Sequence, residues 1–230
     1  RWNNMIVQLA QANIVPDRLE ATDGNEPLPD DIANVFCRNM CTDSMIGCAF
    51  SHIRAWRKLA ASQDKFHVIF EDDVTIPRNL KQKIDNVWPN DTFDILSLGC
   101  TECQPSFKTQ SVVTMLLDYF LSLATPNYND GTCHAQTSTR KACVYRPRVA
   151  LGTHAYILRR EGALKLLDVI AKEKISYHID FMIQKFASRK LIRTLAVYPN
   201  IVNQETKLKT STISGSNQID EKLSRECCPL

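Results

Sequence analysis

The sequence predicts an α/β fold with a parallel central sheet, and three observations support this class. Short apolar runs at 66–70 and 93–99 have the length and composition of buried strands. Apolar residues at helical spacing follow or precede them, from about 43 to 62 and from 80 to 87. The order strand, helix, strand indicates β-α-β units, whose strands run parallel and are joined by right-handed crossovers.

The strand predicted at 66–70 runs directly into the acids Glu71, Asp72 and Asp73. We expect this strand to be buried and central, with the acids at its carboxyl end, where open α/β sheets bind ligands. Adjacent carboxylates repel one another unless a cation lies between them, and a hard divalent metal is the simplest one. Because side chains alternate along an extended segment, Asp73 and Glu71 share one side and are the predicted metal ligands. A solvated acidic turn capping the segment at Pro77 is the alternative.

The length and the net charge of the chain argue against several classes of function. The 230 residues suffice for one well-buried α/β domain, and the 44% hydrophobic and 23% charged residues are typical of a globular protein. A formal net charge of +3, without a basic run interleaved with aromatics, argues against nucleic-acid or membrane-surface binding. No apolar stretch reaches the roughly 18 residues of a membrane span. No signal peptide is evident at Arg1, which favours a cytoplasmic over a secretory location; the oligomeric state stays open.

Nine cysteines form an odd set, so at least one is unpaired if the others pair. Cys48 falls on the apolar stripe of a predicted helix and is interpreted as a small buried hydrophobe. The four cysteines between 100 and 143, with His134, fit either a structural zinc site or disulfides, and their irregular spacing does not choose between them. The redox compartment therefore stays open, and the sequon at 90–92 matters only in a secreted chain.

Elsewhere the chain alternates between periodic segments and loops. Apolar residues at helical spacing predict a helix at 2–12, and residues 18–22 read as a short strand before the turn at Asp23. Residues 100–149 lack a clear pattern and are interpreted as an insertion on the substrate side. The pattern then predicts, in order, a strand at 153–158, a helix at 159–172, a helix beginning near Asp180, a strand at 193–198 and a polar tail, with 216–230 outside the domain.

Several separated segments resemble glycosyltransferase family 25, which includes lipooligosaccharide galactosyltransferases and collagen hydroxylysine galactosyltransferases. The likeness depends mainly on Ile46–Trp56, where a glycine-cysteine pair is followed by Ser51 and His52, and on the acidic block Ile69–Val74. Further matching segments are 20–24, 98–100, 152–158, 179–180 and 201–204. The likeness covers about residues 1–215, in the order that the family has.

The resemblance implies a single domain of the GT-A type over residues 1–215. A Rossmann-like half, with a mostly parallel central sheet flanked by helices, would bind the nucleotide sugar, and the other half the acceptor. It implies an inverting transfer of a hexose, usually galactose, from a UDP-sugar to a hydroxyl of a glycan or hydroxylysine-type protein, with Mn²⁺ or Mg²⁺. Two departures stand out: the family's first strand is absent before Arg1, and the insertion at 100–149, where the acceptor would be chosen, does not match closely.

The resemblance and the residue chemistry together suggest roles. A metal at Asp73, with Glu71, would offset the charge that grows on the departing diphosphate. Inversion in one displacement needs a base on the acceptor side, and Asp180 is the candidate, although Asp is also a preferred helix N-cap. His154 is a second metal ligand, a diphosphate contact or a strand histidine bonded to backbone. The donor-binding candidates are Asp23, Ser51, His52, Arg54, Asp72, His154 and Gln204.

Other interpretations compete with these roles. His52 lies on an apolar helix face, where a histidine is as often a core residue as a functional one, and Arg54 could be a surface residue. A degenerate GT-A domain that binds a UDP-sugar or glycan without transfer is favoured by the absent first strand. A zinc-stapled interaction module and a transferase using UDP-glucose or UDP-N-acetylglucosamine are further alternatives.

Overall fold

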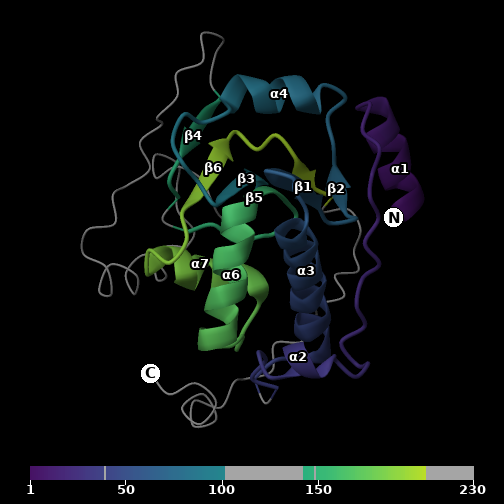
Figure 1. The fold of residues 1–230 in the computed structure, drawn as a ribbon. Coiled ribbons are helices and arrows are strands. Elements are labelled where there is room, and N and C mark those ends of the chain that lie inside the picture. Colours follow the sequence, from purple (N-terminus) through teal and green to yellow (C-terminus); the bar gives the residue numbers. More distant parts are fainter. Residues whose placement is uncertain (39, 102–141, 148, 206–230) are drawn as a thin grey trace.

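The computed structural model describes residues 1–38, 40–101, 142–147 and 149–205 (Figure 1). Most of the expected insertion at 100–149, and the tail at 216–230, lie outside these residues. In chain order the elements are α1 (Trp2–Gln11), α2 (Asp30–Ala33), α3 (Asp43–Ala61), β1 (Phe66–Phe70), β2 (Val74–Thr75), α4 (Leu80–Val87), β3 (Ile95–Gly99), β4 (Cys143–Tyr145), β5 (Ala155–Arg159), α6 (Arg160–Glu173), α7 (Ile179–Ser188), β6 (Thr194–Tyr198) and β7 (Asn203–Gln204).

The main sheet is mixed, with strand order β1-β5-β3-β6-β4. β3 and β6 pair in parallel, while β1 with β5, β3 with β5, and β4 with β6 pair antiparallel. Three of the five strands, β1, β3 and β6, nevertheless point the same way, because β5 lies between β1 and β3 with the opposite direction. The predicted α/β fold with a helix-flanked sheet is therefore confirmed, and this architecture is compatible with the GT-A type.

The prediction that the strand at 66–70 is central and buried is wrong. β1 is an edge strand, and Phe66 and Val68 remain 41% and 36% exposed. Its apolar run is the kind that a buried strand has, but periodicity carries no information about which strand lies beside which. The neighbour of β1 is β5, which comes from more than 80 residues later in the chain.

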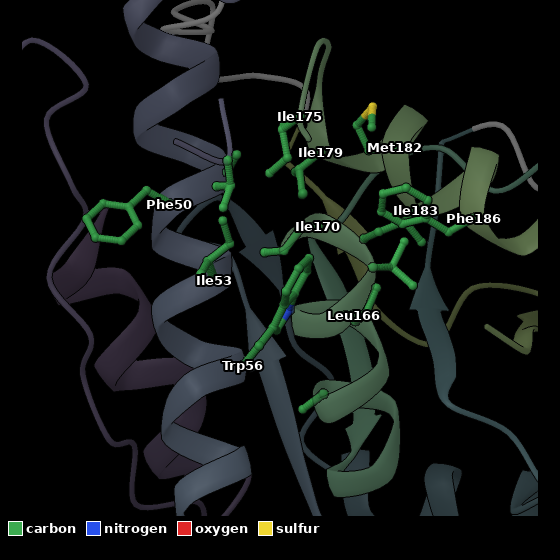
Figure 2. Close-up of a cluster of buried hydrophobic side chains, with 14 of the residues drawn as sticks. Phe50, Ile53, Trp56, Leu166, Ile170, Ile175, Ile179, Met182, Ile183 and Phe186 are labelled. Carbon is green, nitrogen blue, oxygen red and sulfur yellow. The ribbon is translucent and has the colours of Figure 1, made fainter. Parts of the chain in front are cut away.

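Helices cover both faces of this sheet. Along β5, Tyr156 and Leu158 pack in the cluster formed with α3, α6 and α7, while Ala155 and Ile157 pack in the cluster formed with α1 and α4. This alternation follows from the pleat, which sends successive side chains to opposite faces. Figure 2 shows the first cluster, in which Trp56 of α3 lies against the side chains of α6, with those of α7 beyond.

Residues 18–22, predicted as a strand, form none. The backbone N–H of Thr22 donates instead to Ser51 Oγ (2.9 Å), and Arg54 Nη1 donates to the Glu20 carbonyl (2.8 Å). The polar groups of this segment are thus satisfied by side chains of α3 rather than by a sheet partner. A Cβ on Gly47 would lie 2.5 Å from the Thr22 carbonyl oxygen, so the glycine is what permits this close approach.

The N-cap of α3 is Thr42, whose hydroxyl accepts a hydrogen bond from the Met45 backbone N–H (3.3 Å). The helix then presents one face to α6, which runs beside it in Figure 1.

The strand directions bring distant segments together at one edge of the sheet. β1, β3 and β6 end there and β5 begins there, because Ala155 pairs with both Phe70 and Gly99. The small β2–β7 sheet adjoins it, since the Glu205 backbone N–H donates to the Asp73 carbonyl (2.6 Å) and the Glu71 N–H to the His154 carbonyl (2.9 Å). We call this the C-terminal edge: residues 71–73, 152–154 and 203–205.

The cysteines within the described residues divide into two kinds. Cys100 and Cys143 are disulfide-bonded, whereas Cys37, Cys41 and Cys48 are not. The sequence left a structural zinc site and disulfides as alternatives, and for Cys100 and Cys143 the structure supports disulfides. Disulfides are typical of oxidising compartments, so they weigh against the predicted cytoplasmic location, which stays a prediction. The remaining cysteines, Cys103, Cys133, Cys227 and Cys228, lie outside the described residues.

Candidate functional site

Two of the three acids share the C-terminal edge with a buried histidine. Glu71 and Asp73 both act electrostatically on His154, which is only 2% exposed. Asp72 lies on the other side of the chain, where its side chain is 55% exposed and forms an ion pair with Arg1 (3.3 Å). The alternation expected for an extended segment is therefore present. We call Glu71, Asp73 and His154 the carboxylate–histidine cluster.

This cluster contains buried polar atoms without hydrogen-bond partners. Five such side-chain atoms occur among the described residues, and three of them are Asp73 Oδ1 and the two ring nitrogens of His154. The other carboxylate oxygen, Asp73 Oδ2, accepts from Gln204 Nε2 (3.1 Å). An unmet buried polar group costs about 1–3 kcal/mol, so a concentration of them at one point indicates a place where a ligand, ion or water supplies the missing partners.

The protonation of His154 suits it to accept such a partner. Burial lowers its pKa, and the Glu71 and Asp73 carboxylates and a contact with the Val202 backbone, whose geometry falls short of a hydrogen bond, act in the opposite direction without reversing the shift. At neutral pH the ring is therefore uncharged, and one of its nitrogens carries a free lone pair.

A glycine lets His154 come this close to the strands. A Cβ on Gly99, at the end of β3, would lie 2.0 Å from the Val202 carbonyl oxygen and 2.6 Å from His154 Nε2. Any larger residue would displace one or both of them. This close approach explains why β3 ends on a glycine, Gly99.

Glu71 is held by a buried network that reaches back into α3. Its Oε1 accepts a hydrogen bond from Thr153 Oγ1 (2.7 Å) and lies 3.4 Å from His52 Nε2. His52 Nδ1 lies 2.9 Å from the Tyr156 hydroxyl, which also accepts from Trp56 Nε1 (2.9 Å). Both ring nitrogens of His52 are thus engaged by protein atoms, and its side chain is 6% exposed.

His52 and Glu71, the two ionisable members of this network that form an ion pair, shift each other's pKa. Burial by itself lowers the pKa of His52, but Tyr156, Cys48 and Glu71 raise that pKa well above its ordinary value. Burial by itself raises the pKa of Glu71, but His52, Thr153 and His154 lower it. His52 and Glu71 therefore form an imidazolium–carboxylate pair, so that His52, within the core face of α3, acts on the site by fixing Glu71.

Asp180 reaches the same edge through the loop before β5. It lies in the first turn of α7, whose N-cap is His178. Asp180 Oδ2 accepts from the Gly152 backbone N–H (3.0 Å), and its Oδ1 accepts from the Phe181 N–H (2.8 Å). Asp180 is thus not the cap; it connects α7 to the residue that precedes Thr153.

The remaining donor-binding candidates form a separate group along α3. Ser51 and Arg54 hold the segment 20–22, and Asp23 Oδ1 accepts from the backbone and side-chain nitrogens of Asn25 (2.9 and 2.8 Å). The bonds from Asn25 lower the pKa of Asp23, which is exposed. Within the described part of the chain, no hydrogen bond joins Asp23, Ser51 or Arg54 to the carboxylate–histidine cluster.

Comparison with known families identifies the chain. A family model described as glycosyltransferase family 25 (LPS biosynthesis protein) matches residues 1–183, more than half of the sequence. The chain belongs to glycosyltransferase family 25. None of the curated proteins compared with it matches. Family membership makes the protein a glycosyltransferase, with a sugar donor and an acceptor as its partners.

The matched range of this family 25 chain covers every candidate site residue except Gln204. Gln204 nonetheless joins the site, because it bonds Asp73. A search for membrane spans found no helix in the described ranges that is both long enough and apolar enough to cross a bilayer.

The family 25 site offers few protein ligands to a metal. Among the residues that the structure describes, no group of three or more His, Cys, Asp or Glu side chains could hold an ion by itself. Asp73 Oδ1 and one nitrogen of His154 are the buried atoms able to accept a cation. Mg²⁺ and similar ions are commonly held by one or two carboxylates together with substrate phosphates and water, so this donor set fits an ion that a bound diphosphate would complete.

Sequence reasoning missed three members of the family 25 site. Thr153 and Tyr156 lie within the predicted strand at 153–158 but were assigned no role, and Trp56 was placed on the apolar face of the predicted helix. The signal for the last two was their polar tips, since a buried indole N–H or phenol hydroxyl needs a partner. The partner could not be known in advance, because about 100 residues separate Trp56 and His52 from Tyr156 along the chain.

Proposed function

We propose that this family 25 domain transfers a hexose, galactose first among the donors to test, from a UDP-sugar to a hydroxyl group. The acceptor would be a glycan or a hydroxylysine-type protein, and the transfer would invert the sugar with the help of Mn²⁺ or Mg²⁺. One observation carries the proposal: in a glycosyltransferase, three buried polar atoms of Asp73 and His154 lack partners where β1, β3 and β6 end. A diphosphate with its cation would supply those partners.

Asp73 and His154 would hold the metal, and the protein prepares both. Gln204 Nε2 fixes one oxygen of Asp73 and leaves Oδ1 open. Burial keeps His154 neutral, so that one nitrogen can donate a lone pair. When bound, the ion would act as a Lewis acid that offsets the negative charge on the departing diphosphate.

Glu71 would complete the arrangement from a fixed position. Thr153 and His52 both engage Oε1, which orients the carboxylate and leaves Oε2 able to face the ion or its water shell. Rigid support of this kind limits the reorganisation that charge development at the diphosphate would otherwise require.

Asp180 is the proposed base on the acceptor side. Two backbone N–H groups fix its carboxylate beside Gly152, two residues before His154. Each carboxylate oxygen accepts more than one hydrogen bond, so a hydroxyl of the acceptor can still donate to Asp180 as its proton is removed. The remaining donor-binding candidates would act less directly: Ser51 and Arg54 by holding the segment that contains Asp23.

Release of UDP from UDP-galactose, measured with and without Mn²⁺, tests the proposal. The wild type should release UDP faster with Mn²⁺ and an acceptor, and Asp73→Asn should lose this metal-dependent rate. Asp85→Asn is the matched control, because this exposed acid forms an ion pair with Lys81 on α4. UDP binding without UDP release in wild type, under any donor and metal tried, would favour the degenerate, non-catalytic domain and reject the transferase mechanism.

A thermal-shift series would identify the donor. Ligands that bind only the native state raise its melting temperature by mass action. UDP-galactose, UDP-glucose and UDP-N-acetylglucosamine should each be compared with UDP, with and without Mn²⁺. We expect the largest metal-dependent shift for UDP-galactose; a larger shift for another sugar would reassign the donor while keeping the site.

A further inference from the structure

A cavity of about 350 Å³ lies at the opposite edge of the sheet, where β3 and β6 begin. Its walls come from the residues before β3, the residue after β4, the middle of α6 and the segment between α7 and β6. Strands of five residues span roughly 16 Å, which places this cavity well away from the C-terminal edge. We call it the N-terminal cavity.

Cationic side chains dominate the N-terminal cavity. Arg146, Lys165, Lys190 and Arg193 line it, and Asp94 is the one acid among the lining residues. The lining residues thus carry a formal charge of three positive units. Such a cavity attracts anions, because its low-dielectric walls focus the field of the charges around it.

Asp94 offsets only one of the four cations, Lys165, with which it forms an ion pair. Asp94 accepts from Lys165 Nζ at both oxygens (2.8 and 2.9 Å) and from the Arg193 backbone N–H (2.8 Å). The Arg193 guanidinium donates to the carbonyl of Thr92 (3.0 Å), which orients it while leaving its charge uncompensated. Arg146 and Lys190 form no ion pair with any residue that the structure describes.

We propose that the N-terminal cavity binds a multivalent oxyanion, namely a phosphate or sulfate group, free or carried on a sugar. Two uncompensated cations and an oriented guanidinium match the several oxygens of such a group, and Arg is suited to bidentate contact with it. The volume lies in the range of small-ligand sites and admits a group larger than a single ion. This inference does not depend on the donor or metal proposed for the C-terminal edge.

Calorimetric titration of the full chain with inorganic phosphate, inorganic sulfate and glucose 6-phosphate, at constant ionic strength, tests this inference. The test variant is Arg146→Gln/Lys190→Asn; Asn suits position 190 because Lys190 has φ 60°, a conformation that Asn tolerates. The matched control is Arg78→Gln/Lys83→Gln, which removes the same charge from exposed positions elsewhere. A third variant, Asp73→Asn, alters the C-terminal edge alone.

We expect saturable binding to wild type, weakened by about tenfold or more in the cavity variant, since charge-assisted hydrogen bonds are the strong ones. The control and Asp73→Asn should bind as wild type does. Tighter binding of glucose 6-phosphate than of phosphate would assign the site to sugar esters, and equal binding to the free ion. Absence of saturable binding, equal weakening in the control, or loss in Asp73→Asn instead of the cavity variant would overturn the inference.

Discussion

The two ends of the sheet each contain a carboxylate beside a strand, and the two carboxylates differ in whether the protein satisfies them. Asp94, before β3, has both oxygens occupied by Lys165 and the Arg193 N–H. Asp73, at the C-terminal edge, has one buried oxygen with no partner. A carboxylate with both oxygens hydrogen-bonded to the protein holds elements of the fold together. A carboxylate with an oxygen that has no partner can still bind a ligand.

The surroundings of the two acids differ in the same sense. Around Asp94 the charges are mainly positive, and the acid is neutralised by a neighbour that is part of the fold. Asp73 and Glu71 both act on the neutral His154, and Asp73 forms no ion pair with any residue that the structure describes. The comparison therefore predicts that substitutions at Asp73 affect activity and substitutions at Asp94 affect stability.

The largest effect is expected from Asp73→Asn. Loss of the open carboxylate should lower kcat/KM for the UDP-sugar by at least about 100-fold, since metal assistance is worth several kcal/mol. The free energy of unfolding should change by no more than about 1 kcal/mol, because the amide oxygen can still accept from Gln204. Activity assays and urea unfolding on the same preparation check both parts. An Asp73→Asn protein that is active but unstable would contradict the predicted contrast between Asp73 and Asp94.

Asp94→Ala should act on stability. It removes the acceptor of the buried Arg193 N–H and of Lys165, which should lower the free energy of unfolding by about 2 kcal/mol. Urea denaturation with the midpoint and slope fitted separately measures this loss. Asp85→Ala serves as the comparison, because its ion pair with Lys81 is exposed and contributes little. Equal losses in the two variants would show that Asp94 does not hold the strands.

A smaller, pH-dependent effect is expected from His52→Gln. The folded-state pKa of His52 is raised, so its stabilisation is complete below its ordinary pKa of 6.5 and is lost as pH rises through the folded value. The folded-state pKa of Glu71 is lowered, so its contribution is present above its ordinary 4.5 and is lost as pH falls through the folded value. Wild type should therefore exceed His52→Gln in stability most clearly between pH 4.5 and pH 6.5.

Melting temperatures of wild type and His52→Gln at several pH values between 5 and 9 would test this prediction. The difference between them should shrink as pH rises above 6.5. Lys58→Gln, on the same helix but half exposed, controls for the loss of a cation from α3. A difference that stays constant across this range would mean that folding does not shift the pKa of His52, and one that grows as pH rises from 5 to 6.5 would mean that His52 is neutral in the folded protein.

The sequence was informative wherever a segment's own periodicity determined its structure. The helices α1, α3, α4, α6 and α7 and the strands β1, β3, β5 and β6 all lie where the apolar patterns predicted. The short strands β2, β4 and β7 were missed, and 18–22 was wrongly predicted as one. Two or three residues hold too little pattern, and their pairing depends on segments far along the chain.

The candidate site shows the same division. Alternation along 71–73 predicted which acids share a side, and the structure agrees, with Asp72 facing solvent. Periodicity placed His52 on a buried face but could not reveal that it pairs with Glu71, nor that Tyr156 supports it. Asp180 was predicted as a base or a cap, and it is not the cap; its role as a base stays a prediction. Its bond to Gly152 could not be foreseen, because this contact exists only once α7 packs beside that loop.

By itself, the sequence determined the elements, the acidic end of β1 and the family, because each depends on residues adjacent or regularly spaced in the chain. The tertiary structure decided that β5 separates β1 from β3, which brings His154 near Glu71 and Asp73 and leaves buried polar atoms of His154 and Asp73 without partners. It also decided that cations from three distant segments surround one cavity. Strand order and side-chain satisfaction are properties of long-range packing, and local periodicity carries no record of them.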